Sequence, residues 1–149
     1  MISGNNQSFV NQTKLFINDG SGNYSEASGT PFEPLVRPHL VFADFDNDGD
    51  EDLIITGSGP TSMFNTKVYT NDGNGSFTEV NGLPFTDFGN AYLAVADIDK
   101  DNDSDIITGG LPSDFILATK LFINTINTLS TEVFSPFVET KLLPKPIKW

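Results

Sequence analysis

An acidic segment of 14 residues occurs twice in this chain of 149 residues, and it constrains the fold more than any other feature. Residues 44–57 read DFDNDGDEDLIITG, and residues 97–110, which begin 53 positions later, read DIDKDNDSDIITGG. The same interval of 53 residues separates Lys14, Lys67 and Lys120, which open the segments KLFIN, KVYTN and KLFIN. A period of this size is typical of a repeat architecture, in which each unit packs against its neighbours.

Each copy of the acidic segment places an aspartate at every second position. These aspartates are Asp44, Asp46, Asp48, Asp50 and Asp52 in the first copy and Asp97, Asp99, Asp101, Asp103 and Asp105 in the second. Carboxylates spaced so closely repel one another when the loop curls, and Lys100 is the only basic residue nearby. The sixth position holds Gly49 in one copy and Asn102 in the other, two residue types that tolerate the left-handed backbone of a sharp turn. The pattern therefore predicts two loops that each wrap around a divalent cation.

Calcium suits such a loop because it accepts six to eight oxygen ligands in flexible geometry, whereas magnesium tends to keep its waters. The expected side-chain ligands are Asp44, Asp46, Asp48 and Asp52 at the first site and Asp97, Asp99, Asp101 and Asp105 at the second. We expect Asp50 and Asp103 to contribute their backbone carbonyls. Carboxylates saturated by a metal leave no open coordination position, so both calcium sites are predicted to be structural rather than catalytic.

Two other interpretations explain less of the acidic segment. Solvated acidic turns would need no metal, but two copies in one phase, each followed by Leu/Ile-Ile-Thr-Gly, favour a shared metal-binding role. An EF-hand needs flanking helices and a bidentate Glu at position 12, where the two copies have Ile55 and Thr108. The flanking segments are short and β-branched, which indicates strands instead.

One complete unit predicts four strands joined by short loops. The order is an apolar strand, the acidic loop, a second strand, a polar connection, a third strand, a Gly-rich turn and a fourth strand. No useful helical periodicity occurs. Four-stranded antiparallel units of this size indicate an all-β fold of β-propeller blades, about three in the chain, with a β-helix or sandwich as the alternative. The predicted divisions are a partial blade at 1–29, full blades at 30–82 and 83–135, and a tail at 136–149.

The third unit departs from the repeat after its third strand. Residues 120–124 are faithful, but the following turn, TINTLSTEVF, contains no glycine. Residues 131–133 match residues 78–80, so the fourth strand is expected there. The tail KLLPKPIKW falls where a fresh first strand would lie, and Pro144 and Pro146 restrict such a strand to a sheet edge.

Charge and composition narrow the range of partners. The formal net charge of −12 argues against nucleic acid and anionic membrane surfaces. There is no run of about 20 apolar residues that would insert into a membrane, and no signal-peptide pattern is found in this chain. Cysteine is absent, which neither requires nor excludes secretion. Because loops of this kind are usually filled by millimolar calcium outside cells, we expect an extracellular or cell-surface location.

The DFDNDGDED loop, the LIITG strand and the later NDGxGxF/Y turn together resemble the FG-GAP/VCBS-like calcium-binding repeat family, over about residues 1–134. Members include the head of integrin α subunits and many secreted bacterial proteins and lectins, and their repeats form blades of propellers, most often with seven blades. The resemblance implies that each acidic loop joins the first and second strands of a blade and binds structural calcium through the five aspartates named above.

The number of blades departs from that family, because three blades are too few to close a ring. We therefore expect either a fragment of a longer propeller or a homo-oligomer. In a dimer that closes six blades, the tail strand of each copy would complete the partial blade of the other.

Three functions remain open, and the first is a non-enzymatic binding or adhesion scaffold for glycan or protein ligands. If the acidic loops and Gly-rich turns share one face, ligands would use the opposite face, formed by the connections at 57–66 and 109–119 and by the two Pro-Phe linkers. Aromatic side chains with polar neighbours suit sugars or protein surfaces, although they could instead pack between blades. The candidate ligand-binding residues are Met63, Phe64, Phe88, Asp114 and Phe115.

The second function is the propeller part of a secreted polysaccharide-acting enzyme, which the resemblance also implies for some relatives. The chain has one histidine, no cysteine and no nucleophile-elbow motif. His39 takes the place of Tyr92 in the repeat, which predicts a strand position, and a carboxylate pair such as Glu33 and Asp87 would need a suitable separation. We expect no catalytic residues. The third function is a purely structural, self-assembling repeat unit.

Overall fold

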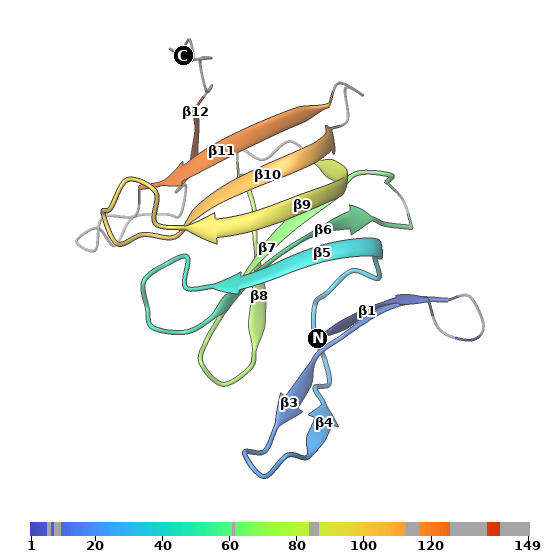
Figure 1. The fold of residues 1–149 in the computed structure, drawn as a ribbon. Helices are drawn as coiled ribbons and strands as arrows, with labels where there is room; N and C mark the ends of the chain where they lie inside the picture. Colours follow the sequence, from blue (N-terminus) through green and yellow to red (C-terminus); the bar gives the residue numbers. More distant parts are fainter. Residues whose placement is uncertain are drawn as a thin grey trace.

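The computed structural model describes residues 1–5, 7, 10–60, 62–83, 87–112, 117–125 and 137–140. Within these ranges the fold is all-β, as predicted, with twelve strands in antiparallel sheets and no helix (Figure 1). In the same ranges, nothing helical is long and apolar enough to cross a membrane.

The second unit is a complete four-stranded antiparallel sheet. Its strands, in sheet order, are β5 (Val36–Ala43), β6 (Asp52–Ser58), β7 (Asn65–Asn71) and β8 (Phe77–Val80). The first acidic loop joins β5 to β6, and the Gly-rich turn joins β7 to β8. Gly73 and Gly75 have positive φ in that turn, and the Asp72 carboxylate accepts hydrogen bonds from the backbone N–H groups of Asn74 and Ser76. Turn chemistry therefore explains Asp72 without a metal.

The third unit repeats this sheet, but its fourth strand lies later in the chain than expected. In sheet order its strands are β9 (Phe88–Ala96), β10 (Asp105–Pro112), β11 (Ala118–Asn124) and β12 (Phe137–Thr140). Residues 131–133, expected to form the fourth strand, lie outside the described residues, and β12 pairs with β11 from Leu121↔Thr140 to Asn124↔Phe137. The connection between β11 and β12 contains no glycine and is longer than the Gly-rich turn of the second unit. Residues 137–140, predicted to belong to the tail, thus complete this sheet.

The described residues of the first unit form counterparts of the second, third and fourth strands of a blade. β1 (Ile2–Asn5) pairs with β2 (Asn11–Lys14), and β3 (Phe16–Asn18) pairs with β4 (Tyr24–Glu26). The KLFIN segment that opens at Lys14 is the counterpart of the third strand, and it is interrupted at Leu15 and continues as β3.

The sheet of the second unit is buried on both faces, because the units pack face to face. One core cluster joins the second unit to the third and consists of Phe45, Ile54, Val68, Leu93, Ile106 and Phe122. The other consists of Phe32, Leu35, Leu53, Ile55 and Tyr69, with Met1 and Leu15 of the first unit packed against it. Successive residues of β6 point to opposite faces, so Ile54 enters one cluster while Leu53 and Ile55 enter the other. The sheets are blade-like, and they do not close a ring within the described chain.

The outermost faces of the first and third units expose side chains whose repeat counterparts are buried or partly buried. Ile98 is 46% exposed, whereas Phe45, at the same position one repeat earlier, is fully buried. Tyr24 is 66% exposed, whereas its counterpart Phe77 packs against the second cluster. Both outer faces thus lack, within the described chain, the cover that an adjacent unit provides elsewhere.

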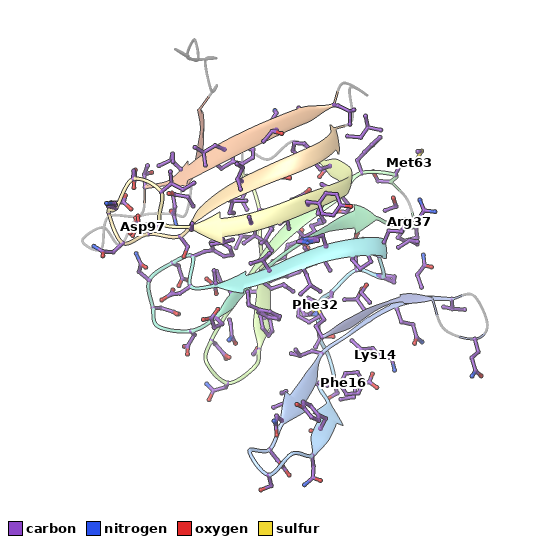
Figure 2. All side chains as sticks on the ribbon, viewed as in Figure 1. Lys14, Phe16, Phe32, Arg37, Met63 and Asp97 are labelled. Atoms are coloured by element: carbon purple, nitrogen blue, oxygen red, sulfur yellow. The ribbon has the colours of Figure 1, made fainter. Side chains whose placement is uncertain are left out.

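The two ends of the blades carry different features. Figure 2 shows Asp97 of the second acidic loop at one end of the sheets, and Arg37 and Met63 at the opposite end. The β6–β7 connection, which holds Met63, therefore lies away from the acidic loops, as the sequence suggests.

Candidate metal centres in the two acidic loops

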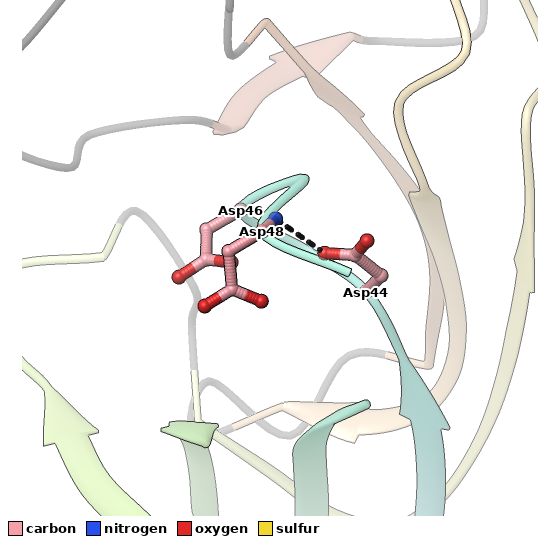
Figure 3. Close-up of side chains that lie close together, drawn as sticks. All are labelled: Asp44, Asp46 and Asp48. Atoms are coloured by element: carbon pink, nitrogen blue, oxygen red, sulfur yellow. Dashed lines mark hydrogen bonds between the residues drawn. The ribbon is translucent and has the colours of Figure 1, made fainter. Parts of the chain in front are cut away.

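The first acidic loop brings three of its carboxylates together. Oxygen atoms of Asp44, Asp46 and Asp48, one from each residue, all lie within 4.8 Å of one another (Figure 3). The Asp44 carboxylate is fixed by the backbone N–H groups of Asp48, at 3.2 Å, and Gly49, at 3.0 Å. The N–H of Asp50 donates to the Asp48 carboxylate at 2.9 Å. These bonds curl the loop so that alternate side chains converge.

Asp52, predicted as a side-chain ligand, closes this loop because its carboxylate binds backbone N–H groups. Its side chain is buried, and its two oxygens accept hydrogen bonds from the N–H groups of Phe45 and Asn71, both at 2.9 Å. Burial raises the pKa of Asp52 to about 6, against the opposing effect of the two hydrogen bonds. It is not one of the three clustered carboxylates. Each carboxylate oxygen has a second lone pair, so this role still permits metal ligation.

The second acidic loop repeats the same hydrogen-bond pattern. The Asp97 carboxylate accepts from the N–H groups of Asp101 and Asn102, and that of Asp105 accepts from those of Ile98 and Asn124. The N–H of Asp103 donates to Asp101 at 3.0 Å, as Asp50 does to Asp48 in the first loop. The clustered carboxylates differ slightly, since here they are Asp97, Asp99 and Asp105. Of the predicted side-chain ligands, Asp101 lies outside the cluster in this loop.

Both loops need left-handed backbone at two positions. Gly49 and Asn102 have φ of 96° and 75°, as their residue types suggest. Asn47 and Lys100, two positions earlier, have φ of 59° and 69°, which the sequence reading does not anticipate. Asn47 could have indicated this conformation, because asparagine is enriched in the left-handed region of backbone conformations.

One buried oxygen in the first loop lacks the partner that a cation would provide. Asp46 Oδ1 is buried and makes no hydrogen bond with the described residues. Burial, followed by the charge of Asp48, raises the pKa of the Asp46 carboxyl. A buried carboxylate oxygen without a donor is costly unless it meets a positive charge. The donor set, all carboxylate oxygens, is the one that hard cations such as Ca²⁺ prefer, so the residues fit calcium.

The two acidic loops also contact each other across the interface between the second and third units. Asn47 donates a hydrogen bond from its side chain to the carboxylate of Asp103, and Asn124 donates to the carbonyl of Phe45 at 2.8 Å. Asp103 is buried and Asn124 is fully buried. The sequence reading missed both contacts, because they join residues 56 and 79 positions apart.

The carboxylates of Asp50 and Asp103 lie away from the clusters. The Asp50 side chain approaches Gly73 so closely that a Cβ there would collide with its carboxylate. The Asp103 carboxylate, as described above, faces Asn47. Their assignment as backbone-carbonyl ligands stays a prediction.

The five predicted ligand-binding residues do not form one exposed group. Met63 is 66% exposed and Phe64 is half-buried, both in the β6–β7 connection. Asp114 and Phe115 lie outside the described residues. Only 1% of Phe88 is accessible, so this candidate packs between the units, which is the alternative that the sequence left open.

Phe88 is instead held between the second and third units at the start of β9. Its carbonyl accepts a hydrogen bond from the Thr56 hydroxyl at 2.7 Å, and its N–H donates to the Thr66 hydroxyl at 3.2 Å. Its repeat counterpart is Leu35, which is also fully buried. The burial of Phe88 could have been predicted from its equivalence to the apolar Leu35, but its polar neighbours in the sequence suggested a binding surface instead.

The residues considered for catalysis make structural contacts. His39 lies in β5, as its place in the repeat predicts, and its Nδ1 accepts the N–H of Leu93 at 3.2 Å. Glu33 accepts a hydrogen bond from the Asn65 side chain, and Asp87 accepts one from the N–H of Thr66 at 3.2 Å.

Comparison with known proteins gives one match. The model of a family described as FG-GAP-like repeat matches residues 1–55 and again residues 44–108, and the second match spans both acidic loops. Searches of curated proteins and of solved structures found no match.

Proposed function

Because the chain belongs to the FG-GAP-like repeat family, we propose that it is a calcium-stabilised, non-enzymatic module that binds glycan or protein ligands outside the cell. The observation that carries the calcium part is the repeated loop geometry, in which three carboxylates converge in each loop and one buried oxygen lacks a donor. Repeats of this family are typically extracellular, where millimolar calcium would keep such sites filled.

Calcium, when bound, would supply positive charge that offsets the repulsion among the clustered carboxylates. Asp44, Asp46 and Asp48 would hold it in the first loop, and Asp97, Asp99 and Asp105 in the second. Because the loops contact each other through Asn47 and Asp103, ordering them would also strengthen the interface between the second and third units. The effect on this chain would therefore be stability rather than chemistry.

Unfolding measurements with and without calcium test this assignment. With calcium at about 100 times its Kd, each site would add about 2.7 kcal/mol to the free energy of unfolding. That corresponds to roughly 5–10 °C in Tm for a chain of this size. Asp48→Asn should remove the contribution of one site. The matched control is Asp72→Asn, because Asp72 is an exposed turn aspartate whose hydrogen-bonded oxygen the amide retains. A Tm that a chelator leaves unchanged would refute the calcium assignment.

The binding part of the proposal is supported by the arrangement of the blade ends. The acidic loops lie at one end of the sheets, and the opposite end carries the β6–β7 connection, in which Met63 is exposed (Figure 2). A glycan array and assays of polysaccharide cleavage, both in millimolar calcium, separate a binding module from an enzyme. Turnover of an acidic polysaccharide would contradict the non-enzymatic assignment.

Self-assembly is a second candidate function, favoured by the exposed outer faces. Ile98 and Tyr24 are exposed at positions where an adjacent unit covers their counterparts Phe45 and Phe77. We propose that the outer face of the third unit in one copy packs on the outer face of the first unit in another, so that two copies close six blades. The alternative is that further repeats of a longer propeller cover these faces.

The solution mass of the calcium-loaded chain tests this pairing. Light scattering after size exclusion should give a dimer, and Ile98→Asp should shift it towards monomer because a charge would enter the interface. A strict monomer at all concentrations would rule out pairing of copies and favour the longer propeller.

A further inference from the structure

The first strands of the second and third units border a small open hollow that the sites described above leave unused. It has a volume of about 210 Å³ and is lined by Arg37, Pro38 and His39 of β5 and by Ala91 and Tyr92 of β9. His39 and Tyr92 occupy the same repeat position, so the packing of adjacent blades brings two copies of one position together. We call this hollow the Arg37 pocket.

The charged and polar side chains that line the Arg37 pocket offer hydrogen-bond donors and no carboxylate. Arg37 is the only arginine in the sequence, is exposed, and forms no hydrogen bond or ion pair with any described residue. His39 Nδ1 accepts the N–H of Leu93, so a neutral ring carries its proton on Nε2 as a further donor. The Tyr92 hydroxyl can donate as well. In a chain with 20 acidic and 8 basic residues, a hollow without a carboxylate in its lining favours an anionic ligand.

The aromatic side of the Arg37 pocket is exposed and contacts His39. Tyr92 is 75% exposed, and its ring meets His39 edge-on at a centroid distance of 5.7 Å. An exposed aromatic ring beside hydrogen-bond donors can pack against the C–H face of a sugar ring while the donors bind its polar groups. The volume of the pocket is smaller than that of sites for drug-sized ligands, and it suits a single sugar unit.

The backbone at Arg37 adopts an unfavourable conformation. Its φ is 49°, in the left-handed region, although it precedes a proline, and the register between β5 and β6 shifts between Val36 and His39. Strain of this kind clusters at ligand-binding positions, where the surrounding structure maintains it. Arg37 also lies at the end of the sheets opposite Asp97 of the second acidic loop (Figure 2).

We propose that the Arg37 pocket binds the carboxylate of a terminal acidic sugar, such as a hexuronic acid. Arg37 pairs with the carboxylate in bidentate geometry, His39 Nε2–H donates to a ring substituent, and Tyr92 packs against the sugar ring. A single terminal sugar fits better than a polyanion, because the net charge of −12 repels an extended acidic polymer. This inference rests on the proposed glycan-binding function and names its ligand class.

Titration of the calcium-loaded chain with methyl β-glucuronide, followed by calorimetry and by the amide signal of Leu93, tests the pocket. The Leu93 N–H donates to His39, so it reports a ligand bound there. Methyl β-glucoside, which has the same ring without the carboxylate, should bind at least about tenfold more weakly, because a charge-assisted bidentate pair is lost. Arg37→Gln and Tyr92→Ala should each weaken glucuronide binding by about tenfold or more. Asp72→Asn, in the exposed turn between β7 and β8, should leave it unchanged.

Several results would overturn the proposal. The pocket assignment is wrong if the glucuronide does not bind at millimolar concentration, or if the glucoside binds equally well. It is also wrong if Arg37→Gln retains binding, or if a peptide ending in glutamate displaces the glucuronide at a lower concentration. Failure of the proposed function would give a different result. If the glucuronide does not bind but the glycan array shows neutral ligands, only the pocket assignment is wrong, whereas an array and a protein-ligand screen that are both blank contradict the binding module itself.

Discussion

Replacing Gly110 by alanine should destabilise the chain through a collision that the adjacent Gly109 does not have. A Cβ at Gly110 would lie 2.7 Å from both Cα and Cβ of Ala91 and 3.3 Å from its nitrogen. A Cβ at Gly109 would meet only the Thr119 hydroxyl, at 3.4 Å, which is ordinary contact. Neither glycine has positive φ, so backbone strain is the same for both substitutions. The pair therefore isolates the steric effect.

The magnitude follows from two opposing contributions. Overpacking against atoms that cannot move aside costs about 1–3 kcal/mol, and replacing a strand glycine by alanine recovers about 0.5–1 kcal/mol of chain entropy. Gly110→Ala should thus lower the free energy of unfolding by about 1–2 kcal/mol, while Gly109→Ala should be neutral or slightly stabilising. Ala91 and Tyr92 line the Arg37 pocket, so Gly110→Ala should also weaken glucuronide binding.

Urea unfolding followed by far-UV circular dichroism, in millimolar calcium, measures both variants against the parent chain. The corresponding change in Tm for Gly110→Ala is a decrease of roughly 2–8 °C. Equal stability of the two variants would refute the close approach of β9 to β10 at Ala91. Loss of stability in Gly109→Ala alone would show that the register of these strands differs from the one described.

Two further substitutions test the interface between the second and third units. Phe45→Ala should lower the free energy of unfolding by about 3–5 kcal/mol, because Phe45 is fully buried in the cluster between these units. Ile98→Ala, at the equivalent exposed position, should lower it by under about 1 kcal/mol in a monomeric chain. Equal losses in chemical unfolding would show that another unit or copy covers Ile98. Asn124→Ala should cost about 1–3 kcal/mol, because it removes the side chain that donates to the buried carbonyl of Phe45. The control is Asn18→Ala, at the exposed counterpart two repeats earlier, and similar thermal shifts for both would contradict the contact between Asn124 and Phe45.

The strands and the acidic loops could be predicted because their signals are local. Short β-branched segments and Gly-rich turns located β5 to β8, and alternate aspartates placed Asp44, Asp46 and Asp48 on one side of a curled loop. Position six needed left-handed backbone for the same local reason, and Gly49 supplied it. The place of Asp52 in the loop was also predictable, but its two backbone partners were not, since one of them, Asn71, comes from β7.

The sequence by itself determined the repeat, the strand order within a blade and the positions of the carboxylates, since each depends on spacing along the chain. Only the tertiary structure decided which side chains another unit covers. Phe45 and Ile98 share a repeat position and differ in burial because one faces a neighbouring sheet and the other does not. Phe88 is buried and His39 meets Tyr92 for the same reason: packing of one sheet on the next joins residues far apart in sequence, and no local pattern encodes which faces meet.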